Sequence, residues 1–340
     1  MLTLLLHFEN RERMKDIHDI RRTVEKELEQ YLELFQQSLD HTDPTLKQAL
    51  AHIRQRRGKM MRPLLVLLVA REFGTVCEKT LRSAVTLELL HTASLVHDDV
   101  VDNSEERRGQ AAEHTLYGNK IAILVGDYLL SQSLHQASLT GDVRIVDIIA
   151  KLGGTLSEGE IRQLDNIRIA KVSEEDYFHV IHHKTAALFE ACARLGALSS
   201  GASEERIETA AKLGEIIGIC FQIRDDIFDY YSDSTIGKPT GNDMAEGKLT
   251  LPALFALRQN NEAQAAEAQE WAKRVKQKTA TSEEIAALID YTKRVGGIDY
   301  AREAMEKYRA EAMPLISTFT NEQVREALTD YLDYTIARPL

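Results

Sequence analysis

The segment TLRSAVTLELLHTASLVHDDVVD, residues 80–102, joins a long apolar run to a compact group of acids. Leucine, valine and alanine recur through it at helical spacings, and no proline interrupts it. The run ends in Asp98, Asp99 and Asp102, which form a D-D-x-x-D motif. Positions four apart share one face of a helix, so Asp98 and Asp102 are expected to act as a carboxylate pair.

The same motif occurs again at Asp225, Asp226 and Asp229, also after a mainly apolar helical run. Neighbouring acids repel each other, and the C-terminal end of a helix disfavours negative charge, each at a cost of up to about 1 kcal/mol. Two matched copies of this unfavourable arrangement indicate a compensating cation. Carboxylate oxygens suit Mg²⁺, which fills its remaining positions with water and substrate phosphate. The alternative is a pair of solvated acidic helix ends.

Helical periodicity extends in both directions from these motifs. Asp43 and Pro44 are expected to open one helix as N-cap and first residue, and Ser173 to open another through a capping box. Polar, glycine-containing stretches at 103–118 and 232–248 predict irregular structure. The predicted fold is all-α, a single domain over residues 1–340 with roughly a dozen helices. The helices are expected at 14–39, 44–57, 63–73, 80–101, 119–137, 142–152, 157–169, 173–198, 203–231, 249–258, 263–278, 282–295, 298–317 and 321–337.

Composition excludes several classes of protein. A net charge of −11 argues against nucleic-acid binding as the main task. Cys77, Cys192 and Cys220 lie far apart, so neither a disulfide framework nor a structural zinc site is expected, and a reducing, cytoplasmic location is favoured. The apolar start MLTLLLHF (1–8) is too short to span a membrane and is a poor signal peptide. Residues 1–13 are expected to form a poorly ordered or docked extension, and no integral membrane segment is expected.

Basic residues accompany both acidic motifs. Lys59 and Arg62 lie at a glycine break that opens a helix, where free backbone N–H groups also attract anions. Arg107 and Arg108 follow the first motif, and the guanidinium fork of arginine matches phosphate oxygens. Further candidates are Lys184 with Thr185, Lys238 and Lys248. The alternative for any one of them is a solvated surface charge.

These stretches together resemble the trans-isoprenyl diphosphate synthase family, the head-to-tail prenyltransferases. The resemblance rests on GKMMRP (58–63), LELLHTASLVHDDVVDNSEERRG (87–109), HKTAALFE (183–190), GICFQIRDDIFDYYSD (218–233) and GKPTGNDMAEGKLTLP (237–252). They occur in family order and span most of the chain. The resemblance implies an isoprenoid synthase fold, with the helices around a deep central cavity.

The resemblance also implies roles for individual residues. Asp98, Asp102 and Asp225 resemble the ligands of up to three Mg²⁺ ions that hold the allylic diphosphate primer, with Asp99, Asp226 and Asp229 as auxiliary groups. The residues that match the allylic diphosphate side are Arg107, Lys184, Thr185, Gln222, Lys238 and Lys248. Those that match the pocket for isopentenyl diphosphate are Lys59, Arg62, His91 and Arg108. Asp98, Asp102, Asp225, Lys184 and Lys238 are the expected catalytic residues.

The basic loop departs from the family pattern at two positions. Arg57 and Met60 stand where the family usually has glycine and arginine, which affects the expected loop shape. By pattern alone His91 is better interpreted as a satisfied core histidine, and only the resemblance assigns it to substrate. His97, His182 and His183 are expected to be structural.

The implied reaction needs no side-chain nucleophile. Mg²⁺ and basic groups stabilise charge on the leaving diphosphate, the allylic bond ionises, and isopentenyl diphosphate attacks the carbocation. Family knowledge places product-length control one helical turn below the first motif, at Ala93 and Ser94. Because a turn rises about 5.4 Å, two small residues there leave depth for a medium or long product of about six to ten isoprene units, as in quinone side chains. Alternatively, Ala93 and Ser94 only permit close helix packing.

Three other functions compete with this interpretation. A shorter-chain farnesyl or geranylgeranyl synthase would share every motif. A class I terpene cyclase usually has a different second metal motif, and a non-catalytic synthase subunit usually loses both acidic motifs.

The family implies a homodimer, for which the helix at 119–137 is a plausible interface, although a heteromeric partner is also compatible with the sequence.

Overall fold

The computed structural model describes residues 16–55, 58–107, 110–168, 173–231, 240–259 and 263–337, without the side chains of Arg107 and Arg168. Within these ranges the chain is helical almost throughout, and the predicted all-α fold is confirmed. The α-helices are α2 (Ile17–Arg22), α3 (Glu25–Ser38), α4 (Pro44–Gln55), α5 (Met61–Phe73), α6 (Glu78–Val101), α7 (Glu113–Tyr117), α8 (Asn119–Leu139), α9 (Val143–Arg168), α10 (Glu174–Ile181), α11 (Ala187–Ser199), α12 (Glu204–Phe228), α13 (Asn242–Ala245), α14 (Leu251–Ala256), α15 (Ala265–Lys276), α16 (Ser282–Arg294), α17 (Gly297–Ser317) and α18 (Glu322–Ala337).

Both predicted helix starts are confirmed. The side chain of Asp43 accepts the Leu46 N–H at 2.9 Å, and α4 begins at Pro44. At α10 the Ser173 hydroxyl accepts the Asp176 N–H at 3.0 Å, while the Asp176 carboxylate accepts the Ser173 N–H at 3.2 Å. Each cap satisfies N–H groups that the first turn of a helix leaves unpaired.

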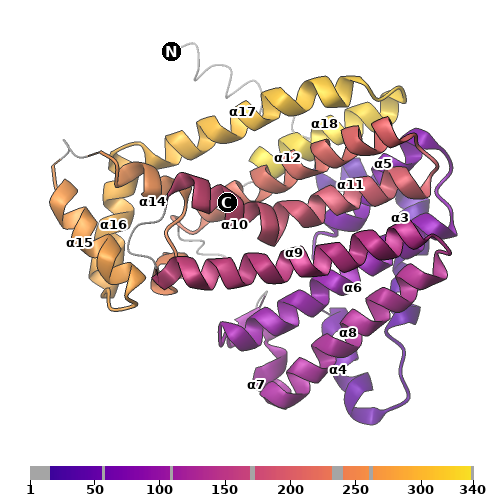
Figure 1. Cartoon of the computed structure of the whole chain (residues 1–340), viewed down its shortest axis with the longest axis horizontal. Coiled ribbons are helices and arrows are strands. Elements are labelled where there is room, and N and C mark those ends of the chain that lie inside the picture. Colours follow the sequence, from indigo (N-terminus) through magenta and orange to yellow (C-terminus); the bar gives the residue numbers. More distant parts are fainter. Residues whose placement is uncertain are drawn as a thin grey trace. The chain divides into compact units, whose positions relative to one another are not determined.

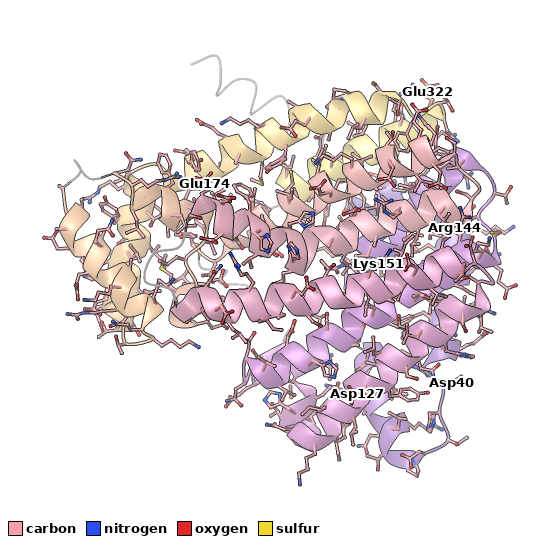
Figure 2. All side chains as sticks on the ribbon, in the orientation of Figure 1. Asp40, Asp127, Arg144, Lys151, Glu174 and Glu322 are labelled. Carbon is pink, nitrogen blue, oxygen red and sulfur yellow. The ribbon has the colours of Figure 1, made fainter. Side chains whose placement is uncertain are left out.

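The prediction of two helices over 142–169 was wrong. α9 continues through Gly153 and Gly154, and neither glycine has another atom within 4 Å of the position that a Cβ would occupy. Glycine costs a helix only about 1 kcal/mol relative to alanine, which packing elsewhere in the helix offsets. Ile145 and Ile149 are buried on one face of α9, while Arg144 and Lys151 project from the helix into solvent (Figure 2).

The predicted helix at 14–39 is divided in two, because Thr23 and Val24 separate α2 from α3. The stretch 103–118, predicted to be irregular, contains α7 and an antiparallel pair of two-residue strands, β1 (Glu106–Arg107) and β2 (Gln110–Ala111). The second stretch predicted to be irregular contains α13, and its residues 232–239 lie outside the described ranges, as do residues 1–13.

The described residues divide into two compact units. The first comprises the described residues within 16–154, 188–214 and 315–334, and the second those within 155–187, 215–314 and 335–337. In the first unit α6 packs along α8 and also contacts α3, α5 and α7 (Figure 1). In the second unit α16 contacts α14 and α15, and α10 contacts α14.

The core of the first unit centres on α5. Every residue from Leu64 to Ala70 is fully buried, so this helix is apolar on all sides, as a helix inside a core must be. Gly196 of α11 lies against it. A Cβ on Gly196 would lie 2.6 Å from the Val66 carbonyl oxygen and 3.1 Å from the Val69 Cβ. The two helix backbones therefore approach as closely as glycine allows.

We expect Gly196→Ala to lower the free energy of unfolding by about 1–3 kcal/mol, because the new methyl group meets backbone rather than a movable side chain. Urea denaturation followed by circular dichroism measures this. The matched control is Gly154→Ala in α9, which has open space and should leave stability unchanged or raise it by about 0.4–1 kcal/mol. Equal stability of the two variants would contradict the close approach of α5 and α11.

Candidate active site

The first acidic motif lies at the end of α6. Asp98 is in the last turn, and the Asp102 N–H donates to the Asp98 carbonyl oxygen at 2.8 Å. The two residues are therefore one turn apart on one helix face, and both are half-buried. Asp99 is 0% exposed and lies inside the unit. The motif thus presents two accessible carboxylates and buries the third.

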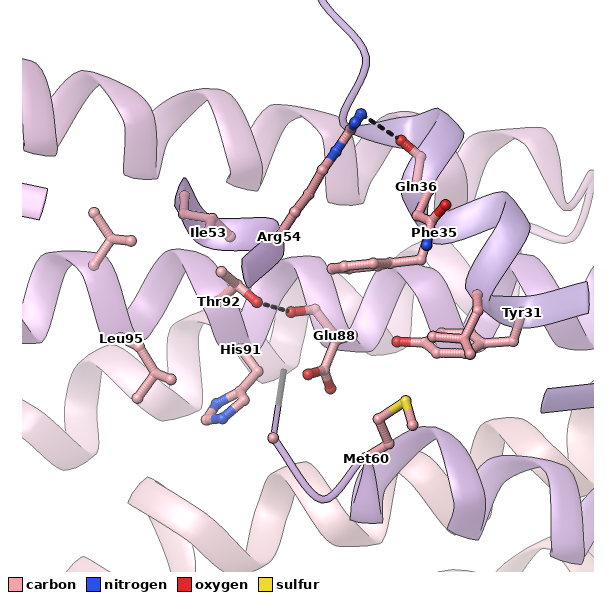
Figure 3. A pocket seen from close by; sticks show the side chains of 13 residues that line it. Tyr31, Phe35, Gln36, Ile53, Arg54, Met60, Glu88, His91, Thr92 and Leu95 are labelled. Atoms are coloured by element: carbon pink, nitrogen blue, oxygen red, sulfur yellow. Dashed lines mark hydrogen bonds between the residues drawn. The ribbon is translucent and has the colours of Figure 1, made fainter. Parts of the chain in front are cut away.

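The α6 face that carries the motif also lines a cavity of about 300 Å³ (Figure 3). Glu88, His91 and Leu95 follow each other along this face toward Asp98 and Asp102. Ala93 and Ser94 do not belong to the cavity lining. Ala93 is buried, and the half-buried Ser94 donates its hydroxyl to the His91 carbonyl oxygen at 2.8 Å.

The basic loop before α5 is held by aromatic rings. The Lys59 ammonium lies 5.6 Å from the centre of the Tyr334 ring, and the Arg62 guanidinium lies 5.1 Å from the centre of the Phe189 ring. Such cation–π contacts hold a long side chain in one place. Met60 has φ +50°, a left-handed conformation that a non-glycine residue rarely adopts. The loop therefore makes its turn at one of the two residues that depart from the family pattern.

The second acidic motif ends α12, and its middle acid is buried. Asp226 is 3% exposed and accepts hydrogen bonds from the Tyr177 hydroxyl at 2.6 Å and the Gln222 amide at 2.8 Å. Burial, reinforced by the nearby Asp243 carboxylate, raises the pKa of Asp226, and these two hydrogen bonds oppose the shift. Asp225 is half-buried. The second motif, like the first, keeps one acid inside and leaves another accessible.

Asp229 organises the segment that follows the motif. Its carboxylate accepts the N–H groups of Asn242 at 3.0 Å and Asp243 at 3.1 Å, which are the first two residues of α13. The sequence analysis did not single out Asp243, whose carboxylate the structure brings into electrostatic range of Asp226. The available signal was its place in the motif stretch 237–252, between Lys238 and Lys248.

Lys184 and Thr185 lie in a π-helical turn, η1 (His182–Ala186), between α10 and α11. The continuous α-helix predicted over 173–198 was therefore wrong at this point. π-turns often occur at functional sites because they reorient side chains. A Cβ on Gly159 of α9 would lie 2.8 Å from the His183 Cβ, so glycine is what lets α9 approach this turn.

The π-turn connects α9 to the second motif. The Lys184 ammonium pairs with Glu160 at 2.7 Å, and the Thr185 hydroxyl donates to the Gln222 side chain at 2.6 Å. Lys184, Gln222 and Lys248 line a cavity of about 130 Å³ together with Asp226. Four residues predicted from sequence to serve the same substrate, Lys184, Thr185, Gln222 and Lys248, thus lie in one neighbourhood of the second unit.

Arg108 and Lys238, together with residues 1–13, lie outside the described residues, as does the side chain of Arg107. The three histidines expected to be structural make contacts of that kind. His97 Nε2 lies 3.2 Å from the Ile123 carbonyl oxygen, His182 Nε2 lies 3.5 Å from a Glu215 carboxylate oxygen, and His183 Nδ1 lies 2.9 Å from the His179 carbonyl oxygen.

The donor types at the two motifs fit a hard divalent cation. Accessible carboxylate oxygens from Asp98, Asp102 and Asp225 are the ligands that Mg²⁺ prefers. In the part of the chain that the structure describes, no three His, Cys, Asp or Glu side chains are arranged to hold a metal ion by themselves. Mg²⁺ commonly takes only one or two carboxylates and fills its other positions with water and phosphate.

Comparison with known proteins assigns the chain to a class of helical prenyltransferases. A family model described as polyprenyl synthetase matches residues 43–291. An octaprenyl diphosphate synthase of Haemophilus influenzae is 32% identical over 316 residues, which cover 93% of this chain and 95% of that protein. The chain belongs to the polyprenyl synthetase family.

Two solved structures support the same assignment. The geranylgeranyl pyrophosphate synthase of Bacteroides thetaiotaomicron is 49% identical, with a TM-score of 0.82 over 94% of this chain and 98% of that one. A polyprenyl synthase of Caulobacter crescentus, complexed with calcium and isoprenyl diphosphate, is 29% identical with a TM-score of 0.89, covering 96% of this chain and 99% of that one. The predicted family, fold and enzyme class are confirmed. No described helix is long and apolar enough to cross a membrane.

The burial of Asp226 gives a prediction for the metal-free protein. Its folded-state pKa is raised, so folding takes up a proton between about pH 4, where an unfolded aspartate titrates, and about pH 8. The free energy of unfolding should therefore fall as pH rises through this range. Asp226→Asn should reduce this change in the free energy of unfolding by more than about 1 kcal/mol. Urea denaturation in EDTA at a series of pH values measures it.

The control for this experiment is Asp147→Asn, which changes an exposed acid of α9. It should leave the pH dependence of the wild type in place. If Asp226→Asn and the wild type show parallel profiles, Asp226 is not held in its protonated form by the fold.

Proposed function

We propose that this chain is a Mg²⁺-dependent trans-polyprenyl diphosphate synthase, which condenses isopentenyl diphosphate head-to-tail with an allylic diphosphate. The observation that carries the proposal is the matched construction of the two D-D-x-x-D motifs. Each ends a long helix, buries one acid and leaves another accessible. Membership of the polyprenyl synthetase family supports this assignment.

The residues that would hold Mg²⁺ are Asp98, Asp102 and Asp225, with Asp99, Asp226 and Asp229 as auxiliary groups. When bound, the metal supplies positive charge that stabilises the leaving diphosphate. The buried Asp226 accepts hydrogen bonds from Tyr177 and Gln222, and Asp229 fixes the start of α13. The Caulobacter crescentus relative complexed with calcium and isoprenyl diphosphate supports a divalent cation here.

The basic residues divide between the two substrates. Lys184, Thr185, Gln222 and Lys248, which surround one cavity or lie beside it, would bind the allylic diphosphate together with Arg107 and Lys238. Lys59, Arg62 and His91, with Arg108, would bind isopentenyl diphosphate. Because aromatic rings already hold Lys59 and Arg62, little side-chain entropy is lost on binding. These fixed positive charges would hold the diphosphate of isopentenyl diphosphate, while the basic groups assigned to the allylic substrate would stabilise the departing diphosphate.

Product length is proposed to be medium or long, for quinone side chains. Ala93 and Ser94 are small, and small side chains one turn below the first motif would leave room for a long product. The Haemophilus influenzae relative is named an octaprenyl diphosphate synthase. A second candidate is a geranylgeranyl diphosphate synthase, which the name of the 49% identical Bacteroides thetaiotaomicron relative favours.

We infer a homodimer formed through α7 and α8. In the described part of the chain these helices expose Leu116, Ile123, Leu124 and Leu134, each more than 40% accessible. A cluster of exposed large apolar side chains on neighbouring helices commonly marks a protein interface.

We also infer that the whole chain works as one catalytic domain. We infer a cytoplasmic location as well, which the free cysteines Cys77, Cys192 and Cys220 support.

The test is an incubation of the purified protein with Mg²⁺, isopentenyl diphosphate and an allylic primer, followed by product extraction. Linear prenyl diphosphate is expected. Asp98→Ala and Asp225→Ala should each reduce turnover at least about a hundredfold, because each removes a carboxylate that would hold the cation, and should leave the helical circular dichroism unchanged.

The matched control for both variants is Asp147→Ala, which removes an exposed acid from α9 and should retain full turnover. Near-normal activity of either motif variant would contradict the metal assignment. Cyclic hydrocarbon as the product would indicate a terpene cyclase, and no product from the wild type would indicate a non-catalytic subunit.

Ala93→Phe should shorten the product, because a ring at this depth would close the space below the first motif. Chromatographic chain-length analysis measures the change. Ala93 is almost fully buried, so Ser94→Phe, at the half-buried neighbour, serves as a second variant, and Ala93→Ser as the small control. An unchanged product distribution in both Phe variants would place the length limit elsewhere.

A further inference from the structure

A carboxylate faces the cavity of the first unit, beside the residues proposed to bind isopentenyl diphosphate. Glu88 is a half-buried residue of α6, one turn before His91. Figure 3 shows its carboxylate pointing into the same space as the His91 ring and the Met60 side chain. An acid in a site for an anionic substrate repels that substrate unless nearby cations compensate it.

Two neighbours of Glu88 cannot provide this compensation. Tyr31 is 2% exposed, and burial together with the charge of Glu88 raises the pKa of its hydroxyl, which therefore stays neutral. The Arg54 guanidinium donates to the Gln36 carbonyl oxygen at 2.7 Å and to Asp40, and it is directed away from Glu88 (Figure 3).

Arg62 lies in the first turn of α5, which packs against α6. Burial raises the pKa of the Cys192 thiol; Arg62 opposes that shift and Glu88 adds to it. Both charges thus lie within electrostatic range of one thiol on α11. The contact of Arg62 with Phe189, three residues before Cys192, places the guanidinium against the same helix. Glu88 and Arg62 thus lie on the neighbouring helices α6 and α5, and the guanidinium of Arg62 also contacts α11.

We propose that Glu88 is a positioning residue for the second substrate, which aims Arg62 and His91 at the diphosphate of isopentenyl diphosphate. Glu88 lies one turn before His91 on the same helix face, and Arg62 lies in the first turn of α5, which packs against α6. The proposal rests on the proposed function of the chain. It assigns Glu88 no contact with the reacting carbons, so its removal should weaken binding of one substrate rather than slow the chemistry.

Glu88→Gln keeps the shape of the side chain and removes its charge. We expect the KM for isopentenyl diphosphate to rise at least about tenfold, while kcat and the KM for the allylic primer change by less than about threefold. Glu88→Asp, which restores the charge on a shorter side chain, should recover part of the loss. The control is Glu78→Gln, at an exposed α6 acid paired with Arg82 outside the cavity, and it should behave as wild type.

A double-mutant cycle tests the connection with Arg62. Because Glu88 is proposed to act through Arg62, the Arg62→Gln/Glu88→Gln double variant should lose little more than Arg62→Gln alone. Additive losses, or equal effects of Glu88→Gln on both substrates, would overturn the proposal, as would a KM for isopentenyl diphosphate within twofold of wild type. If Glu88→Gln loses its helical circular dichroism, Glu88→Asp is tested in its place. The proposal then requires that Glu88→Asp raise the KM for isopentenyl diphosphate more than the KM for the allylic primer.

The wild type separates failure of this inference from failure of the proposed function. A wild type that makes no prenyl diphosphate contradicts the function itself. An active wild type whose Glu88 variants keep the normal KM for isopentenyl diphosphate contradicts only the role of Glu88.

Discussion

Both acidic motifs place negative charge at the C-terminal end of a helix, where it is unfavourable. In each motif one acid is buried and at least one other acid stays accessible at the surface. Asp99 and Asp226 are buried, whereas Asp98, Asp102 and Asp225 stay accessible. In the second motif, donors from Tyr177 and Gln222 stabilise the buried acid. The accessible acids are unfavourably placed with respect to the helix dipole, and the cation proposed above would relieve this arrangement.

Close backbone approach fixes where these charged side chains lie. Gly126 of α8 faces His97, and a Cβ there would lie 2.2 Å from the ring nitrogen, so α6 and α8 touch one residue before the first motif. In the second unit Gly159 of α9 likewise leaves room for a neighbour, the π-turn that carries Lys184 and Thr185. At Gly159 the neighbouring atoms include the backbone of His183 and Lys184, and elements packed this closely tolerate little movement.

The two units hold their basic residues by different means. In the first unit the aromatic rings of Tyr334 and Phe189 contact Lys59 and Arg62. In the second unit Lys184 pairs with Glu160, so the diphosphate proposed above to bind there would have to compete with a carboxylate for that ammonium. Side chains that aromatic rings already hold lose less conformational entropy when a ligand binds. A side chain held by an ion pair instead exchanges its carboxylate partner for the ligand.

The sequence by itself determined the all-α class, the family, both acidic motifs and the helix starts at Pro44 and Ser173, because each rests on local pattern or on residue identity at fixed spacing. Tertiary structure alone decided which acid of each motif is buried, since Asp99 and Asp226 are assigned to the interior by the helices packed around them. It also decided the π-turn at 182–186 and the uninterrupted α9. The sequence pattern predicts a break at Gly153 and Gly154, but packing along the rest of α9 offsets their weakness, and further along the helix Gly159 admits a neighbouring backbone.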